Sequence, residues 1–158
     1  MARRMVLCSV FILSCATFLL AAPKQMQFKV VLSEDEAKSK AGDTFSFAAK
    51  EGQKAEDIVI GREVVLSSAD IAAVSILEAP KDPNRHPVID IAFNAEGAKK
   101  LEKVTKQNVR KKLAVFVDKE ILITPFIIYP LSHGHLRITS WRIPDEGAAN
   151  KFIKDLGF

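Results

Sequence analysis

Three histidines are the first candidates for chemistry, because imidazole is a common metal ligand. His133 and His135 are two residues apart, so on a strand both side chains would point to the same face. A site of the zinc type needs at least one further protein ligand, and His86 is the remaining histidine. Nothing in the sequence ties His86 to the other two. We therefore interpret all three as ordinary turn and strand residues and expect no metal or other cofactor.

The sequence also contains no recognisable motif for covalent or acid–base catalysis. After residue 22 there is no cysteine, no nucleophile elbow, no glycine-rich phosphate loop and no His-Glu metal motif. Asp90 lies between apolar neighbours and is expected to be a paired surface carboxylate. Asp118 and Glu120 belong to a predicted turn. The expectation is a protein that is not an enzyme.

A cluster of positive charge lies along one predicted helix and its exit, with Glu102 as the acidic residue among them. The basic residues are Lys99, Lys100, Lys103, Lys106, Arg110, Lys111 and Lys112. Lys99, Lys103, Lys106 and Arg110 form a candidate surface for anionic lipid headgroups, where each basic residue near a membrane contributes about 1 kcal/mol. The alternative is a solvated helix face. Nucleic acid is not an expected partner, because the net charge of +4 falls to +2 once Arg3 and Arg4 are removed.

The stretch "TPFIIYP" is a candidate for binding a protein partner. Pro125 and Pro130 cannot donate to a sheet, so they indicate an edge strand or a bulge. Phe126, Ile128 and Tyr129 would then flank unpaired backbone groups, where an extended polypeptide can dock as an added strand. The alternative is that these three side chains belong to the core.

The elements that position these residues alternate between strands and helices. Strands are predicted at 26–32, in two short runs within 57–66, and at 74–78 and 87–93, with a short helix starting at Ser67. A helix is predicted over 95–109, capped by Asn94. Its predicted buried stripe is Ala98, Leu101, Thr105 and Val109.

The most apolar stretch after the amino terminus, residues 111–131, predicts a hairpin with Asp118-Lys119 at its turn. Its first strand is apolar on both faces, so both faces should be covered. A third strand at 135–141 and a closing helix at 145–156 follow. The sequence therefore predicts an α+β fold, a small and mainly antiparallel sheet with two principal helices packed on one face.

The amino terminus has the pattern of a secretory signal peptide. Arg3 and Arg4 precede an almost wholly apolar run to Leu20, and Ala21-Ala22 supplies small residues for cleavage. The alternatives are an uncleaved membrane anchor and lipidation of Cys15 in "ILSC". Both cysteines lie in this segment, so no internal disulfide is expected after cleavage. Export to the periplasm or cell envelope is the expectation.

The ordered set of elements and residues resembles the head subdomain of the first periplasmic domain of SecD, a bacterial preprotein translocase subunit. Shared features are Glu96-Gly97-Ala98 opening a helix, Thr105 in its last third, Leu113-Ala114, Asp118, Thr124-Pro125, Gly134, Ile138-Thr139, and Ala148, Ala149 and Leu156 in the final helix. The resemblance runs over roughly residues 63–156. Lys119 and Ser140 stand where the family has glycine.

The resemblance implies a role for the domain but not a mechanism. SecD continues into membrane helices that couple the proton gradient to translocation, and a head alone is not expected to perform that work. We interpret residues 1–22 as the signal peptide, 23–62 as a leading strand and loop region, and 63–158 as the SecD-head-like domain. The expected function is an exported, non-enzymatic envelope module that binds a protein partner or extended polypeptide, in connection with protein translocation. The alternative is a peripheral module or lipoprotein on anionic membrane.

Overall fold

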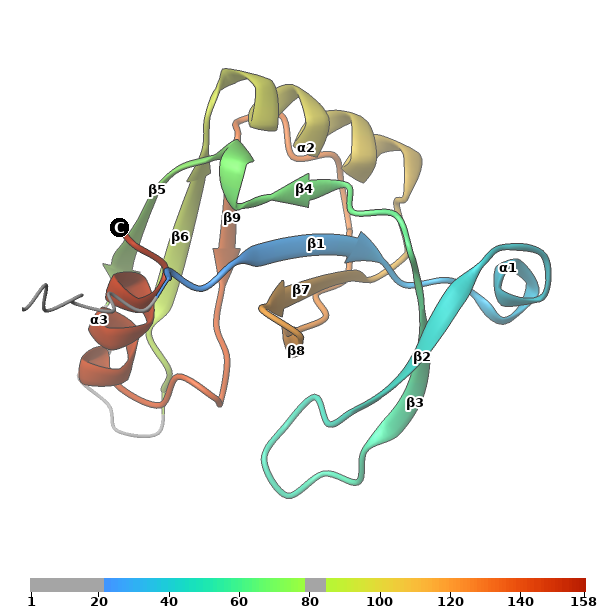
Figure 1. The fold of residues 1–158 in the computed structure, drawn as a ribbon, viewed down its shortest axis with the longest axis horizontal. Helices are drawn as coiled ribbons and strands as arrows, with labels where there is room; N and C mark the ends of the chain where they lie inside the picture. Colours follow the sequence, from blue (N-terminus) through green and yellow to red (C-terminus); the bar gives the residue numbers. More distant parts are fainter. Residues whose placement is uncertain (1–21, 79–84) are drawn as a thin grey trace, which may run out of the picture.

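The computed structural model describes residues 22–78 and 85–158, and the predicted signal segment up to residue 21 lies outside them. The described part of the chain contains nine strands and two principal helices, whose arrangement is drawn in Figure 1. The strands are β1 (Met26–Val30), β2 (Gly42–Phe47), β3 (Glu56–Gly61), β4 (Leu66–Ser67), β5 (Ile71–Glu78), β6 (Val88–Phe93), β7 (Leu113–Val117), β8 (Glu120–Ile123) and β9 (His135–Ile138). The helices are α1 (Glu34–Ser39), the 3-10 turn η1 (Ser68–Asp70), α2 (Ala95–Gln107) and α3 (Glu146–Asp155).

The strands form three antiparallel sheets with the orders β4-β1-β7-β8, β2-β3 and β5-β6-β9. This confirms the α+β class and its antiparallel character. The sequence predicted one small sheet, whereas the structure has three, and the strand that begins at residue 135 does not lie beside β7 or β8. β9 instead pairs with β6, with Leu136 opposite Ile91, and it ends at Ile138. The chain turns after it, where Ile143 N donates to Ser140 O at 2.9 Å.

The main core lies between the two larger sheets and the two principal helices. Its members include Val115 of β7 and Ile91 of β6, Leu101 of α2, and Ala149 and Leu156 at α3. Both helices therefore place their apolar side in the same core, as predicted. α3 begins at the predicted position because the Asp145 carboxylate accepts a hydrogen bond from Ala148 N at 2.7 Å.

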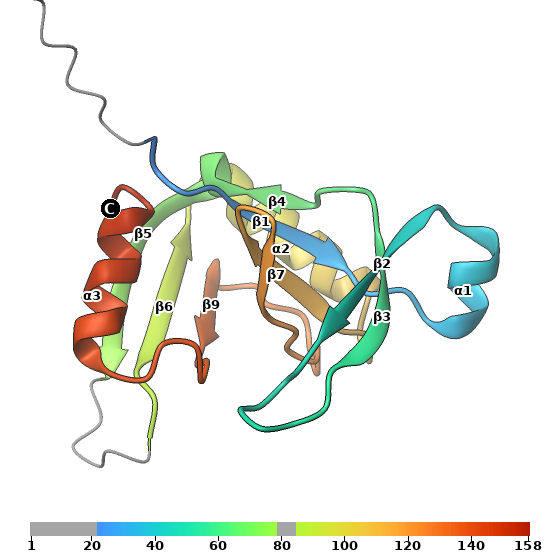
Figure 2. The same cartoon turned by 60° about the horizontal axis from the view of Figure 1, so that its bottom comes forward.

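The second face of β7 is covered by the β2–β3 ribbon, which the sequence did not predict. Ala114 and Phe116 point away from the main core and pack with Phe47 and Ile60 of the ribbon. The rings of Phe45 and Phe116 meet edge to face with centroids 5.3 Å apart. The ribbon and α3 lie on opposite sides of the molecule in Figures 1 and 2. The two apolar faces of β7 are therefore buried by different parts of the molecule: one face packs in the main core and the other packs against the β2–β3 ribbon.

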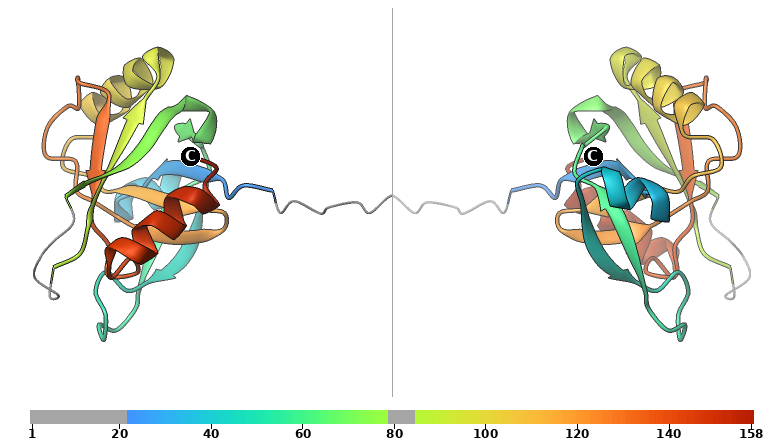
Figure 3. Two further views of the ribbon diagram at one scale, coloured as in Figure 1. Left: turned by 90° about the vertical axis from the view of Figure 1, so that its left-hand side faces the viewer. Right: turned by 90° about the vertical axis from the view of Figure 1, so that its right-hand side faces the viewer.

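The segment 23–62 contributes directly to this packing. β1 lies between β4 and β7 in the first sheet, with Phe28 opposite Val115, and Phe28 is fully buried. The chain near Lys24 lies beside the end of α3, where Lys24 N donates to Asp155 O at 2.8 Å (Figure 3). The division of the chain at residue 62 stays a prediction.

Helix α2 ends two residues earlier than predicted. Asn94 Oδ1 caps its start by accepting from Gly97 N at 2.8 Å, and Asn108 N–H bonds back to the carbonyls of the last turn. Leu101 and Thr105 are buried as expected, but Val109 is 37% exposed. The helical phase stops at Asn108, so Val109 no longer falls on the buried side.

The hairpin turn and the proline position agree with the sequence. Asp118 occupies the turn between β7 and β8 with φ 56°, a left-handed conformation that Asp tolerates better than most residues. Pro125 follows β8, which is the edge strand of its sheet. Within residues 22–78 and 85–158, no helix combines the length and apolarity needed to cross a bilayer.

Candidate docking site

The residues predicted to bind a partner lie together on one surface loop. We call residues 124–131, which follow β8, the docking loop. Phe126, Ile128 and Tyr129 are 62%, 77% and 64% exposed, whereas Ile127 between them is buried in the main core. The alternative that these three side chains are core is therefore wrong. The side chain of Ile127 is buried in the main core and Leu131 packs against that core, whereas Phe126, Ile128 and Tyr129 point outward.

The docking loop is held in place from two sides. Toward β7, Ile127 N donates to Lys111 O at 2.8 Å and Leu113 N donates to Pro125 O at 2.9 Å. Toward α2, Leu131 N donates to Thr105 Oγ1 at 2.9 Å, and the same hydroxyl donates to Leu101 O at 2.7 Å. Thr105 is fully buried, so this contact is shielded from water. The exposed apolar side chains thus stand on a fixed backbone.

A groove of about 860 Å³ runs beside the docking loop. Its other walls come from β9, through His135 and Arg137, and from Leu77 of β5, which is 53% exposed. Sequence reasoning missed Leu77 and Arg137 as members of this site. The signal for them is tertiary, because only the pairing of β5, β6 and β9 brings residues 77 and 137 to the same face.

Asp90 lies beneath the groove and is engaged by two residues of β9. Its Oδ2 lies 2.7 Å from His135 Nδ1, and its Oδ1 lies 3.5 Å from Arg137 Nε. The sequence predicted a paired surface carboxylate. The pairing is observed, but Asp90 is only 8% exposed, because it lies on the central strand of its sheet and the side chains of His135 and Arg137 lie against its carboxylate. Among the residues that the structure describes, no group of three His, Cys, Asp or Glu side chains is placed to hold a metal ion.

Two of the glycines shared with the SecD head, Gly97 and Gly134, lie where a larger side chain would clash with its neighbours. An ideal Cβ on Gly97 would lie 2.9 Å from Asp70 Cβ and closer still to the carbonyl oxygen of Asp70. Gly134 adopts φ +68°, and its Cβ position lies 2.9 Å from Ala98 Cβ. The small residues at 97, 98 and 134 therefore let α2 approach both η1 and the turn before β9. This approach sets the position of Thr105, and through it of the docking loop.

The basic residues of α2 are less uniform than the sequence suggested. Lys100 pairs with Asp70 at 2.6 Å and Lys111 with Glu36 at 2.7 Å. Both acids come from segments distant in sequence, so Glu102 is not the only acid that faces the cluster, contrary to expectation. Lys99 contacts Glu96 at 3.4 Å. Lys103, Lys106 and Arg110 are exposed, and among the residues that the structure describes they form no ion pair within 4.0 Å.

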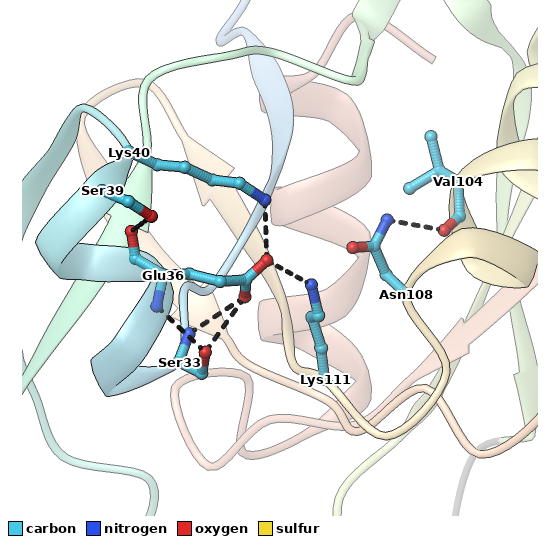
Figure 4. A network of polar contacts seen from close by, with 7 residues as sticks. All are labelled: Ser33, Glu36, Ser39, Lys40, Val104, Asn108 and Lys111. Atoms are coloured by element: carbon cyan, nitrogen blue, oxygen red, sulfur yellow. Dashed lines mark hydrogen bonds and ion pairs between the residues drawn. The ribbon is translucent and has the colours of Figure 1, made fainter.

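Glu36 joins α1 to the start of β7 (Figure 4). Its Oε1 lies 2.7 Å from both Lys111 Nζ and Lys40 Nζ, and its Oε2 accepts from Ser33 N at 3.3 Å. These contacts lower the pKa of Glu36 from 4.5 to about 2, and the hydrogen bond from Lys111 makes the largest contribution. The charged form is therefore the one that the fold stabilises.

This lowered pKa predicts how α1 responds to acid. Because the folded pKa lies below the unfolded value, the stabilisation is complete above about pH 5 and is lost as the pH falls toward 2. Glu36→Gln should therefore lower the free energy of unfolding near pH 7, and the difference from the parent protein should vanish near pH 2. Denaturant unfolding at a series of pH values measures it. Glu51→Gln, an exposed charge loss elsewhere, is the control, and an equal effect in both variants would contradict the assignment.

Comparison with known proteins identifies the family. The sequence model of the family described as "SecDF, P1 head subdomain" matches residues 43–150, more than half of the chain. The chain belongs to this family. The match includes the docking loop, Gly97 and Thr105, so the residues that position the loop lie inside the family's domain.

Relatives among curated proteins are translocase subunits. Protein translocase subunit SecD of Rickettsia prowazekii is 37% identical over 82 residues, which cover 52% of this chain and 15% of the relative. SecD of Acidaminococcus fermentans is 28% identical over 89 residues, covering 51% of this chain and 21% of the relative. The chain thus spans about a fifth or less of the length of these relatives. The resemblance seen in the sequence is confirmed.

The fold is shared with solved SecDF structures. One, described as a membrane component SecDF that enhances protein export, aligns with a TM-score of 0.59 and 23% identity, over 85% of this chain and 62% of that one. A crystal structure of SecDF in a super-membrane-facing form aligns with a TM-score of 0.58. At this identity the comparison shows the SecDF P1 head fold alone.

Proposed function

We propose that this SecDF P1 head protein is an exported, non-enzymatic module of the cell envelope that binds a protein partner or an extended polypeptide through the docking loop. The observation that carries the proposal is the exposure of Phe126, Ile128 and Tyr129 on a backbone fixed at Lys111, Leu113 and Thr105. Exposed apolar side chains that cluster on a rigid support are typical of protein interaction sites.

Family membership supports a link to protein translocation. The relatives are named translocase subunits, and one of the similar structures is described as enhancing protein export. An extended, unfolded polypeptide is the form in which a translocating chain offers apolar side chains and unpaired backbone together. A surface of exposed apolar groups beside a sheet edge suits such a partner.

The proposal is tested by replacing one aromatic side chain at the loop. Tyr129→Ala should leave the melting temperature nearly unchanged, because the side chain is 64% exposed, but weaken binding of a reduced and carboxymethylated unfolded protein by roughly tenfold. Phe158→Ala is the matched control, since Phe158 is also exposed, at 44%, and lies at the end of the chain. Fluorescence anisotropy measures the affinity. Equal binding by the parent protein and Tyr129→Ala would refute the role of the loop.

Export is supported by the positively charged and apolar amino-terminal pattern. Cleavage near Ala22 is expected, and amino-terminal sequencing of protein recovered from the cell envelope tests it. A chain that begins at Met1 would indicate an anchor, and an acylated Cys15 a lipoprotein.

A second candidate function is peripheral binding to anionic membrane. Lys103, Lys106 and Arg110 favour it, because each is exposed and none pairs with an acid among the described residues. Lys99 adds to the same side of the helix, although Glu96 partly offsets its charge.

This candidate predicts salt-sensitive vesicle binding. Association with phosphatidylglycerol vesicles should fall steeply between low and physiological salt, because exposed charges are screened. Replacing Lys99, Lys103 and Lys106 with Gln should abolish it. Cosedimentation measures the bound fraction, with the triple variant Lys24→Gln, Lys119→Gln and Lys151→Gln as a control of equal charge. This function would be excluded if vesicle binding changed neither with the salt concentration nor with the substitutions on α2.

A further inference from the structure

The free edge of β9 presents unpaired backbone groups to the groove. β9 is the last strand of the β5-β6-β9 sheet. Phe93 N donates to Gly134 O at 2.8 Å, and the register continues with Leu136 opposite Ile91. Hydrogen-bonded and non-hydrogen-bonded pairs alternate along an antiparallel ladder. The backbone groups of Leu136 therefore point toward β6, and those of His135 and Arg137 point to the opposite, open edge.

The docking loop is an open edge as well. Its hydrogen bonds toward β7 use Pro125 O and the N–H of Ile127, so the N–H and C=O of Phe126 between them point away from β7. In the described part of the chain, the backbone hydrogen bonds found outside the regular ladders do not reach Phe126, His135 or Arg137. These residues border the same groove. Two open edges and a set of exposed apolar side chains thus meet at one place.

The accessible charge at this groove is positive. The Arg137 side chain is 66% exposed, and Lys112 Nζ lies 5.3 Å from the centroid of the Phe126 ring. Among the described residues, Asp90 is the carboxylate that lines the groove, and it is buried and already engaged by His135 and Arg137. A partner that carries a carboxylate among apolar residues complements these charges.

We propose that an extended polypeptide segment with alternating apolar side chains and one carboxylate docks in this groove as an additional strand on the free edge of β9. Its backbone pairs with His135 and Arg137, its apolar side chains pack on Phe126, Ile128 and Tyr129 of the docking loop, and its carboxylate meets the Arg137 guanidinium. The inference rests on the proposed function and adds to it the binding mode and the chemical class of the segment.

The backbone contribution is tested with a defined peptide. The probe is a capped peptide in which valine and threonine alternate around one central glutamate. In its analogue, each backbone amide that would point toward β9 is N-methylated. This removes the N–H donors for pairing with β9 but keeps every side chain. The analogue should bind the full protein at least roughly tenfold more weakly, since a backbone hydrogen bond contributes about 0.5–1.5 kcal/mol net. Amide hydrogen exchange should show new protection at His135 and Arg137 when the parent peptide binds.

The charge preference is tested with one substitution in the protein and one in the peptide. Arg137→Gln should weaken binding of the glutamate peptide by roughly fivefold and leave binding of its glutamine analogue unchanged, which gives a double-mutant cycle. Lys119→Gln, in the β7–β8 turn, is the control and should change neither. Circular dichroism and the melting temperature check that Arg137→Gln keeps the fold beside Asp90.

Each alternative outcome is distinguishable. If the N-methylated and parent peptides bind equally while Tyr129→Ala still weakens both, side chains alone hold the partner, so strand addition fails and the proposed function stands. If no unfolded protein or peptide binds, both fail. If the protein self-associates in sedimentation at the concentrations used, and His135 and Arg137 become protected without peptide, the groove holds a second copy and the proposal is overturned.

Discussion

Val115→Asp is expected to leave the domain unfolded under conditions in which the parent protein is folded. Val115 is fully buried, pairs with Phe28 on one side and Ile123 on the other, and is surrounded by an apolar cluster. A carboxylate there has no cation within that cluster, and an unpaired buried charge costs several kcal/mol. A domain of this size has only about 5–15 kcal/mol of stability. Loss of the near-ultraviolet circular dichroism signal and of the cooperative melting transition is the measurement.

The control for this prediction is the same substitution at an exposed valine. Val64 is 42% exposed in the segment between β3 and β4. Val64→Asp should change the free energy of unfolding by no more than about 0.5 kcal/mol. A cooperative transition in Val115→Asp at the temperature of the parent protein would show that β7 is not at the centre of the core.

Gly97→Ala should destabilise the protein although alanine favours helices. The added Cβ would meet the backbone of Asp70, whose carbonyl oxygen accepts a hydrogen bond from Asn94 N at 2.9 Å and is fixed by it. Overpacking against fixed backbone costs about 1–3 kcal/mol or more, which exceeds the gain of about 1 kcal/mol from helix propensity. The melting temperature should therefore fall by a few degrees, since a loss of 1 kcal/mol corresponds to about 2–4 °C in a chain of this size.

Gly97→Ala should also disturb the docking loop, because α2 carries Thr105. If the helix shifts away from η1, the bond from Leu131 N to Thr105 Oγ1 lengthens, and the amide of Leu131 should exchange faster. Gly61→Ala is the matched control, since its Cβ would meet Val30 O at 3.5 Å, an ordinary contact. A variant at 97 that is as stable as the one at 61 would refute the close approach of α2 to η1.

Local patterns were sufficient to predict most elements and to propose a candidate docking site. The caps at Asn94 and Asp145, the turn at Asp118 and the alternation of strands 87–93 and 113–117 depend on neighbours within a few residues. Pro125 limited its strand to an edge for the same local reason. The sequence also placed Phe126, Ile128 and Tyr129 in one candidate site. It left open whether they were core, because an apolar residue has the same periodicity whether its face is covered or not.

The tertiary structure decided which faces are covered and which acids meet which bases. The β2–β3 ribbon covers Ala114 and Phe116, while the docking loop has no such cover among the described residues, and both outcomes depend on segments far away in the chain. In the same way, Asp70 and Glu36 neutralise Lys100 and Lys111 across separations of 30 and 75 residues. Side chains so distant are brought together only by the packing of whole elements, and the free energy of that packing is a property of the entire core rather than of any local sequence.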